Sequence, residues 1–206
     1  MVTLLRSLSI LEAPMNHNTA VIPGSMAAVA ARDGMPLAES FLNADAVIIM
    51  DVSSSMTTCD SRGGRPRYDV ACEELAQLQA HMPGKLAVIA FSKHAMFCPG
   101  GRPPEVGVLG VSTNLAGVLQ FAKVADVPGM RFIVISDGEP DDSRESLAIA
   151  KTYNNRIDTI FVGPEGDWHG GRTFLQQLAA ASGGQHIAAD RVQELASKTE
   201  RLLLSA

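Results

Sequence analysis

Short apolar runs alternate with longer stretches of helical spacing along most of this chain, and this alternation limits the fold more than any other feature. Residues 46–50 (AVIIM) are apolar at every position, which is typical of a strand buried on both faces. Residues 68–81 have helical spacing and are followed by a Pro-Gly stop, and residues 86–91 form a second buried run. This order predicts a mostly parallel sheet with helices between its strands.

The alternation continues to the end of the chain. Residues 94–110 are rich in Gly and Pro and predict a loop with a short edge strand at 105–109. Further strands are predicted at residues 131–136, 158–162 and 185–188, and helices at 115–124, 143–153, 173–181 and 190–204, with Ser143 and Asp190 as N-caps. The predicted fold class is therefore α/β, with a doubly wound, mostly parallel central sheet flanked by helices on both faces.

The pattern changes near Asn43, which divides the chain into an N-terminal arm, residues 1–43, and a domain, residues 44–206. In the arm, residues 25–32 and 36–42 predict two short helices separated by Gly and Pro. Helices of this length are not stable alone in water. The arm is therefore expected to lie on its own domain or on a neighbour.

Composition excludes several classes of protein. With 46% hydrophobic and 19% charged residues, the chain is expected to be globular, and its net charge of −5 argues against general binding to nucleic acid or to an anionic membrane. No apolar run approaches the roughly 18 residues that span a bilayer, and the N-terminus makes a poor signal peptide. Three widely spaced cysteines form neither a disulfide framework nor a zinc signature. A cytoplasmic protein is expected.

Two aspartates follow buried strands and carry the strongest functional signal. Asp51 comes directly after the run ending at Met50, and Asp137 after the run ending at Ser136. In a parallel sheet these positions lie at the carboxyl ends of the strands, where ligands gather. A charge at the rim of a dry core is costly unless it is paired or bound to a metal, and no obvious cation stands next to either residue in the sequence.

Hydroxyl groups accompany the two carboxylates. Ser53 and Ser55 stand two and four residues after Asp51, so in an extended segment the three side chains converge, and Thr113 lies in residues 110–115 (GVSTNL). These five oxygen donors suit Mg²⁺, or Mn²⁺ or Ca²⁺, and argue against zinc. They leave at least one coordination position open, which an Asp or Glu of a partner protein would complete.

The same residues resemble a known site. The Asp51-x-Ser53-x-Ser55 motif, the Thr113 turn and Ser136-Asp137-Gly138 are similar to the three parts of the metal-ion-dependent adhesion site of von Willebrand factor A domains, whose fold is Rossmann-like. The similarity covers roughly residues 44–205. It implies that Ser53, Ser55 and Thr113 bind the ion directly or nearly so, and Asp51 and Asp137 directly or through water. One departure is Ser112, where the family often has Gly.

Other residues near this end of the sheet are candidate partner contacts. Glu139 adds negative charge that either raises the affinity for a cation or is solvated. Trp168 and Arg172 are candidate contact anchors, and the alternative for Trp168 is packing under its own loop. Three further candidates are Arg62, Arg65 and Arg67. They form either a basic rim that would steer an acidic partner or an exposed flexible loop.

Three functions fit these observations. The first is a metal-dependent protein-interaction module, in which a carboxylate of a partner protein binds the cation within a multiprotein assembly. The second is a Mg²⁺-dependent phosphotransfer enzyme with Asp51 as nucleophile, but haloacid-dehalogenase-like phosphatases expect a second Asp where this chain has Ser53, and no convincing nucleophile–base pair is present. The third is a metal-independent subunit that assembles through the arm. The first is the hypothesis we favour, which makes the protein a binding module and not an enzyme.

Overall fold

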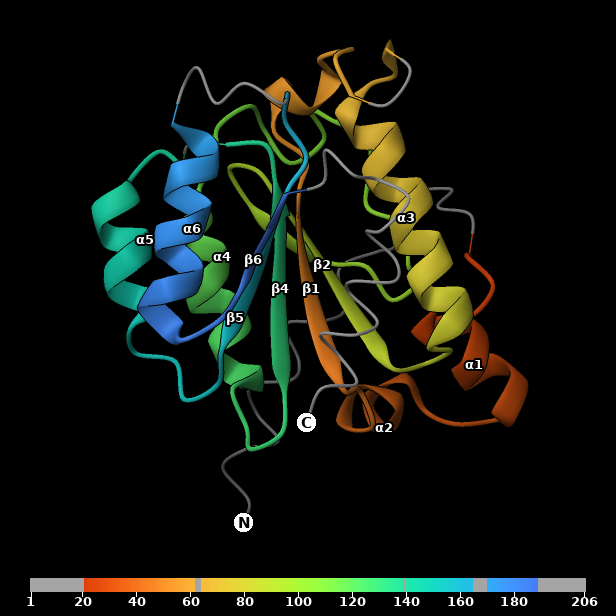
Figure 1. Ribbon diagram of the computed structural model, residues 1–206. Helices are drawn as coiled ribbons and strands as arrows, with labels where there is room; N and C mark the ends of the chain where they lie inside the picture. The colour runs from red at the N-terminus through yellow and green to blue at the C-terminus, as the bar shows by residue number, and fades with distance from the viewer. Residues whose placement is uncertain (1–20, 62–63, 139, 165–169, 189–206) are drawn as a thin grey trace.

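The described part of the chain forms one six-stranded sheet in the order β3-β2-β1-β4-β5-β6 (Figure 1). The structure is a computed structural model and describes residues 21–61, 64–138, 140–164 and 170–188. Neighbouring strands pair in parallel, except that β3 runs antiparallel to β2. The fold class predicted from the alternation is confirmed. The strands are β1 (Ala46–Asp51), β2 (Leu86–Phe91), β3 (Ala95–Phe97), β4 (Arg131–Ser136), β5 (Ile157–Phe161) and β6 (His186–Ala188).

Helices cover both faces of the sheet, which explains why the central strands are apolar at nearly every position. Figure 1 shows α4, α5 and α6 on one face and α3 on the other. Alternate residues of β1 pack into opposite cores: Ile48 and Met50 lie with α3, and Val47 and Ile49 lie with α4 and α6. The main helices are α3 (Arg67–His81), α4 (Leu115–Ala122), α5 (Ser143–Ala150) and α6 (Gly171–Ser182), with 3₁₀ turns η2 (Ser54–Thr57) and η4 (Lys123–Ala125).

The strand order reverses between β1 and β4, and this reversal positions the candidate site. After β1 the chain passes through α3 and adds β2 on one side, whereas after β4 it passes through α5 and adds β5 on the other. The loops that leave the two strands therefore diverge to opposite faces. In open α/β sheets the crevice at such a switch point, outside the carboxyl ends of the strands, is where ligands bind.

Some predicted boundaries are wrong. The edge strand lies at Ala95–Phe97 and not at 105–109, because the chain turns back directly after β2 and Cys98 donates its N–H to the Val88 carbonyl. Helix α5 is capped by Asp142 and not by Ser143, since the Asp142 carboxylate accepts the Glu145 N–H at 2.8 Å. The helix and cap predicted at residues 190–204 and Asp190 lie outside the described residues.

The described part of the arm packs on its own chain. It contains α1 (Met26–Asp33), capped by the Ser25 hydroxyl, and α2 (Leu37–Leu42). Backbone N–H groups of Ile22 and Ala27 donate to the carbonyls of Gly100 and Pro99, each at 2.9 Å. The Met26 side chain is only 1% exposed and belongs to the core beneath α4 and α6. Residues 21–43 are thus attached to the domain by both backbone hydrogen bonds and burial.

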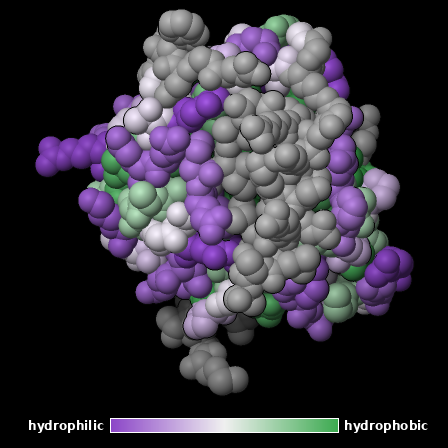
Figure 2. Space-filling view, in the orientation of Figure 1, coloured by the Kyte–Doolittle hydropathy of each residue, from purple (hydrophilic) through white to green (hydrophobic). Residues whose placement is uncertain are grey.

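The face of the molecule seen in Figure 2 is mostly hydrophilic where residues are described, with scattered hydrophobic side chains. Single exposed apolar residues of this kind are normal on protein surfaces. None of the helices in the described ranges combines the length and apolar character that crossing a bilayer requires.

Truncation of Met26 tests whether the arm contributes to the core. Met26→Ala should lower the free energy of unfolding by about 2–5 kcal/mol, because a fully buried side chain leaves a cavity. Leu42→Ala on the neighbouring helix is the matched control, since Leu42 is 82% exposed and its loss should change stability by less than about 0.5 kcal/mol. Chemical denaturation measures both. Equally small effects would contradict the packing of the arm.

Candidate metal centre

Two buried carboxylates meet at the switch point of the sheet. Asp51 is the last residue of β1 and is 0% exposed, and Asp137, directly after β4, is 8% exposed. Parallel pairing of β1 with β4 sets Met50 beside Ile135, so the two aspartates leave the sheet next to each other. The prediction that they share one end of the sheet agrees with this geometry.

Both oxygens of Asp51 are occupied by hydrogen bonds. Oδ1 accepts the backbone N–H of Ser53 at 2.8 Å, and Oδ2 accepts the hydroxyl of Ser136 at 2.6 Å. Burial and, next, the negative charge of Asp137 raise the pKa of Asp51 to about 6, although the hydrogen bonds from Ser136 and Ser53 act in the opposite direction. The site thus holds two like charges whose repulsion a cation would relieve.

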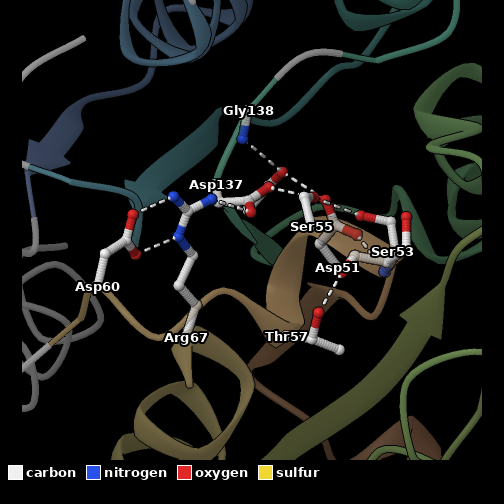
Figure 3. A network of polar contacts seen from close by, with 10 residues as sticks. Asp51, Ser53, Ser55, Thr57, Asp60, Arg67, Asp137 and Gly138 are labelled. Carbon is white, nitrogen blue, oxygen red and sulfur yellow. Dashed lines mark hydrogen bonds and ion pairs between the residues drawn. The ribbon is translucent and has the colours of Figure 1, made fainter. Parts of the chain in front are cut away.

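A chain of hydroxyls links the loop after β1 to Asp137. The hydroxyl oxygens of Ser53 and Ser55 lie 3.1 Å apart, and the Ser55 hydroxyl donates to Asp137 Oδ1 at 3.0 Å (Figure 3). Ser53 is buried, whereas Ser55 is exposed. Four of the five predicted ligands therefore belong to one hydrogen-bonded network that runs from the core to the surface.

Thr113, the fifth predicted ligand, lies on a loop fastened to the other two. The Ser54 hydroxyl donates to the Val111 carbonyl at 3.3 Å. The Thr113 N–H donates to Asp141 Oδ1 and the Asp141 N–H donates to the Thr113 carbonyl, both at 3.0 Å. Backbone and side-chain contacts thus hold the loops after β1, before α4 and after β4 together at the same end of the sheet.

The hydroxyl of Thr113 is not used for helix capping. The N-cap of α4 is Asn114, whose side-chain oxygen accepts the Gly117 N–H at 2.9 Å. Within the described ranges no hydrogen bond is formed by the Thr113 hydroxyl, so it is available to a ligand. Ser112 needs no glycine at its position, because no non-glycine residue of the described chain has a positive φ.

Arg67 supplies a cation that the sequence analysis missed. Its guanidinium donates to Asp137 Oδ2 through Nη1 at 2.5 Å, and to both oxygens of Asp60 through Nε at 2.7 Å and Nη2 at 2.5 Å. The side chain is only 11% exposed, so Arg67 is not part of an exposed rim. The signal was its place as the first residue of α3, the helix that leaves the loop after Asp51. The Arg67 guanidinium also holds the pKa of Asp60 below its usual range.

The remaining candidate contacts divide into two groups. Arg65 is exposed and forms an ion pair with Glu73 at 2.6 Å, and the half-buried Arg172 guanidinium lies 5.0 Å from the centre of the Phe161 ring. Their contact with a partner stays a prediction. Outside the described residues are Arg62, Glu139 and Trp168.

The donor set fits a hard divalent cation. Within the described part of the chain, no three side chains of the His, Cys, Asp and Glu types gather at one point. The groups that do gather are two carboxylates and serine hydroxyls, with the Thr113 loop fastened beside them. Oxygen donors of this kind match Mg²⁺, Mn²⁺ and Ca²⁺ and contain none of the sulfur or imidazole that zinc favours.

A close backbone contact joins the site to α6. A β-carbon added to Gly171, the first residue of α6, would lie 2.5 Å from the Gly138 Cα and 3.0 Å from the Asp137 carbonyl oxygen. Such distances allow no side chain without a shift of one segment. Glycine at this position therefore lets the helix begin directly against the loop that carries Asp137.

Comparison with known proteins identifies the fold. A scan against protein-family models and a search of curated proteins gave no match. Among solved structures, an aerotolerance-related membrane protein from Bacteroides fragilis, crystallised with multiple mutations to serines, aligns with a TM-score of 0.66 and 17% identity, over 78% of this chain and 98% of that one. 

Two further structures lead to the same conclusion. A von Willebrand factor type A protein from Catenulispora acidiphila gives a TM-score of 0.52 and 18% identity, over 77% of this chain and 41% of that one. Manganese-loaded TRAP protein from Plasmodium vivax gives 0.51 and 15%, over 79% and 74%. Similarity at these identities concerns the fold, and the fold of this chain is that of a von Willebrand factor A domain.

Proposed function

We propose that this chain is a metal-dependent protein-interaction module that binds an acidic side chain of another protein through a divalent cation. The observation that carries the proposal is the single hydrogen-bonded network of Asp51, Ser53, Ser55 and Asp137 at the switch point of the sheet. Thr113, on the adjoining loop, is the fifth proposed ligand.

The charge of the site supports a cation. Two carboxylates lie close enough for Asp137 to raise the pKa of Asp51, and a divalent ion would replace this repulsion by attraction to both. Mg²⁺ is the ion we propose, with Mn²⁺ or Ca²⁺ as substitutes. A similar fold is known in a manganese-loaded form, that of the TRAP protein.

Exposure supports a partner ligand. Asp51 and Ser53 are buried, but Ser55 is exposed, so an ion at the outer end of the network lies near the surface. Mg²⁺ takes about six oxygens, and these side chains leave positions that water or a partner carboxylate fills. The three cysteines are free thiols, which fits the cytoplasmic location that we propose.

The geometry favours binding over phosphotransfer. A nucleophilic carboxylate must reach the phosphorus atom with a free oxygen, but Asp51 is 0% exposed and both of its oxygens accept hydrogen bonds. We therefore propose no catalytic role for this chain. The ion does not need this access to Asp51, because we propose that this carboxylate binds it through water. The alternative is assembly through the arm without metal. It differs from the proposed function in one measurable way: a chelator would not disrupt it.

Thr113→Val is the sharpest test of the metal site. The substitution keeps the shape of the side chain and removes a hydroxyl that forms no hydrogen bond with any residue the structure describes. Stability should therefore change by less than about 0.5 kcal/mol. Affinity for Mn²⁺, measured by isothermal titration calorimetry, should fall at least about tenfold, or about 1.4 kcal/mol.

Thr58→Val is the matched control, because Thr58 is exposed at the end of η2, in the same loop as the serines. Its affinity for Mn²⁺ should equal that of the unmodified chain. If Thr113→Val binds Mn²⁺ as tightly as Thr58→Val does, Thr113 is not a ligand and the proposed site is incomplete.

Chelation tests the bridging role of the ion. Proteins captured by the immobilised chain should be released by EDTA and recaptured in excess Mg²⁺, because the partner carboxylate binds the cation and not the protein alone. Quantitative mass spectrometry of the bound fraction measures this, and Thr113→Val should need a higher Mg²⁺ concentration to capture the same proteins. Partners that stay bound in EDTA would instead indicate assembly without metal.

A further inference from the structure

Arg67 divides the two oxygens of Asp137 between two neighbours. Figure 3 shows Arg67 on one side of this carboxylate and the serines on the other. Asp137 Oδ2 accepts Nη1 of Arg67, while Oδ1 accepts the hydroxyl of Ser55. Because each oxygen has a different partner, the carboxylate cannot rotate without losing both bonds. Its Oδ1 atom is thereby directed toward the hydroxyls that are proposed to hold the ion.

Asp60 in turn fixes Arg67. The guanidinium forms a two-bonded fork with Asp60, at 2.7 and 2.5 Å, and uses its remaining Nη1 for Asp137. Paired bonds of this geometry restrain a guanidinium more than a single bond does. The arginine is 11% exposed and the Asp137 side chain 3%, so the pair is little screened by solvent. Asp60, at 32%, anchors the arrangement at the surface.

The same residues set the charge that an ion meets. Asp51, Asp60 and Asp137 contribute three carboxylates and Arg67 one guanidinium, and the carboxylate of Asp141 lies beside Thr113. This excess of negative groups favours a cation. Loss of the guanidinium would raise the preference for a more highly charged ion, and loss of the Asp60 carboxylate would lower it.

We propose that Arg67, held by Asp60, is a positioning residue of the metal site that aims Asp137 Oδ1 at the serine hydroxyls and reduces the negative charge that a bound cation meets. This inference rests on the proposed function, because it assigns Arg67 and Asp60 a role around the same ion. Arg67 is not a ligand itself, since a guanidinium has no acceptor. Arg67 acts on the ion by orienting Asp137 and through the electrostatic field of its positive charge.

Two ions of different charge test the proposal in solution. Affinities for Mn²⁺ and Tb³⁺ are measured by calorimetry and by lanthanide luminescence on the full chain and on variants of each residue. Arg67→Lys keeps the charge but loses the fork, so affinity for both ions should fall by roughly tenfold or more with their ratio unchanged. Arg67→Gln removes the charge, so the preference for Tb³⁺ over Mn²⁺ should rise about tenfold.

Asp60→Asn removes the negative charge at the exposed end of the network and should shift the preference in the opposite direction, toward Mn²⁺. The shift should be smaller than that of Arg67→Gln, because Asp60 contacts Arg67 and not Asp137 and is more exposed. The matched controls are Arg32→Gln and Asp33→Asn. Arg32 and Asp33 form the same two-bonded fork, at 2.7 and 3.0 Å, on α1, away from the carboxyl end of the sheet (Figure 1). Both affinities should stay unchanged in these controls.

The outcomes separate this inference from the proposed function. The unmodified chain could bind metal while neither Arg67→Gln nor Asp60→Asn shifts the ion preference and Arg67→Lys keeps full affinity. That result would overturn the role of Arg67 and leave the proposed metal site intact. Failure of the unmodified chain to bind either ion would overturn both. Opposite shifts in the two charge variants, with unchanged controls, would support the inference.

Discussion

The parallel pairing of β1 with both β2 and β4 is the constraint on which the site depends. Backbone hydrogen bonds fix Met50 opposite Ala90 on one side and Ile135 on the other. Because alternate residues of these strands fill two separate cores, a shift of one residue would exchange the buried faces. The register is therefore held by the whole interior. This register sets the distance between Asp51 and Asp137, without the help of a local interaction between them.

The parts of the fold that the sequence predicts well are those set by continuous apolar runs. Residues 86–91 and 131–136 are strands with the predicted bounds, since a run buried on both faces can end only where polar groups begin. The same logic locates Asp51 and Asp137, each at the polar end of such a run. Their neighbours in the loops follow from chain connectivity, which explains how a metal site could be outlined from residue order alone.

Interactions between distant segments account for what was missed. The ion pair of Arg67 with Asp137 joins residues 70 positions apart, and apart from the place of Arg67 at the start of α3 no local pattern indicates it. The edge strand β3 is similar. Its residues are only half-buried, and its pairing depends on how tightly the chain reverses after β2. Sequence patterns record burial and not the partner of a buried charge.

The contact between Gly171 and Gly138 makes α6 mechanically continuous with the loop of Asp137. Backbone atoms that touch without an intervening side chain have no soft rotamer to absorb a displacement. Helix α6 packs against β5, and its Phe174, Leu175 and Leu178 side chains are buried. A β-carbon at position 171 would have to displace either this packed helix or the loop of Asp137, so a single added methyl group there would alter the geometry around Asp137 without replacing any proposed ligand.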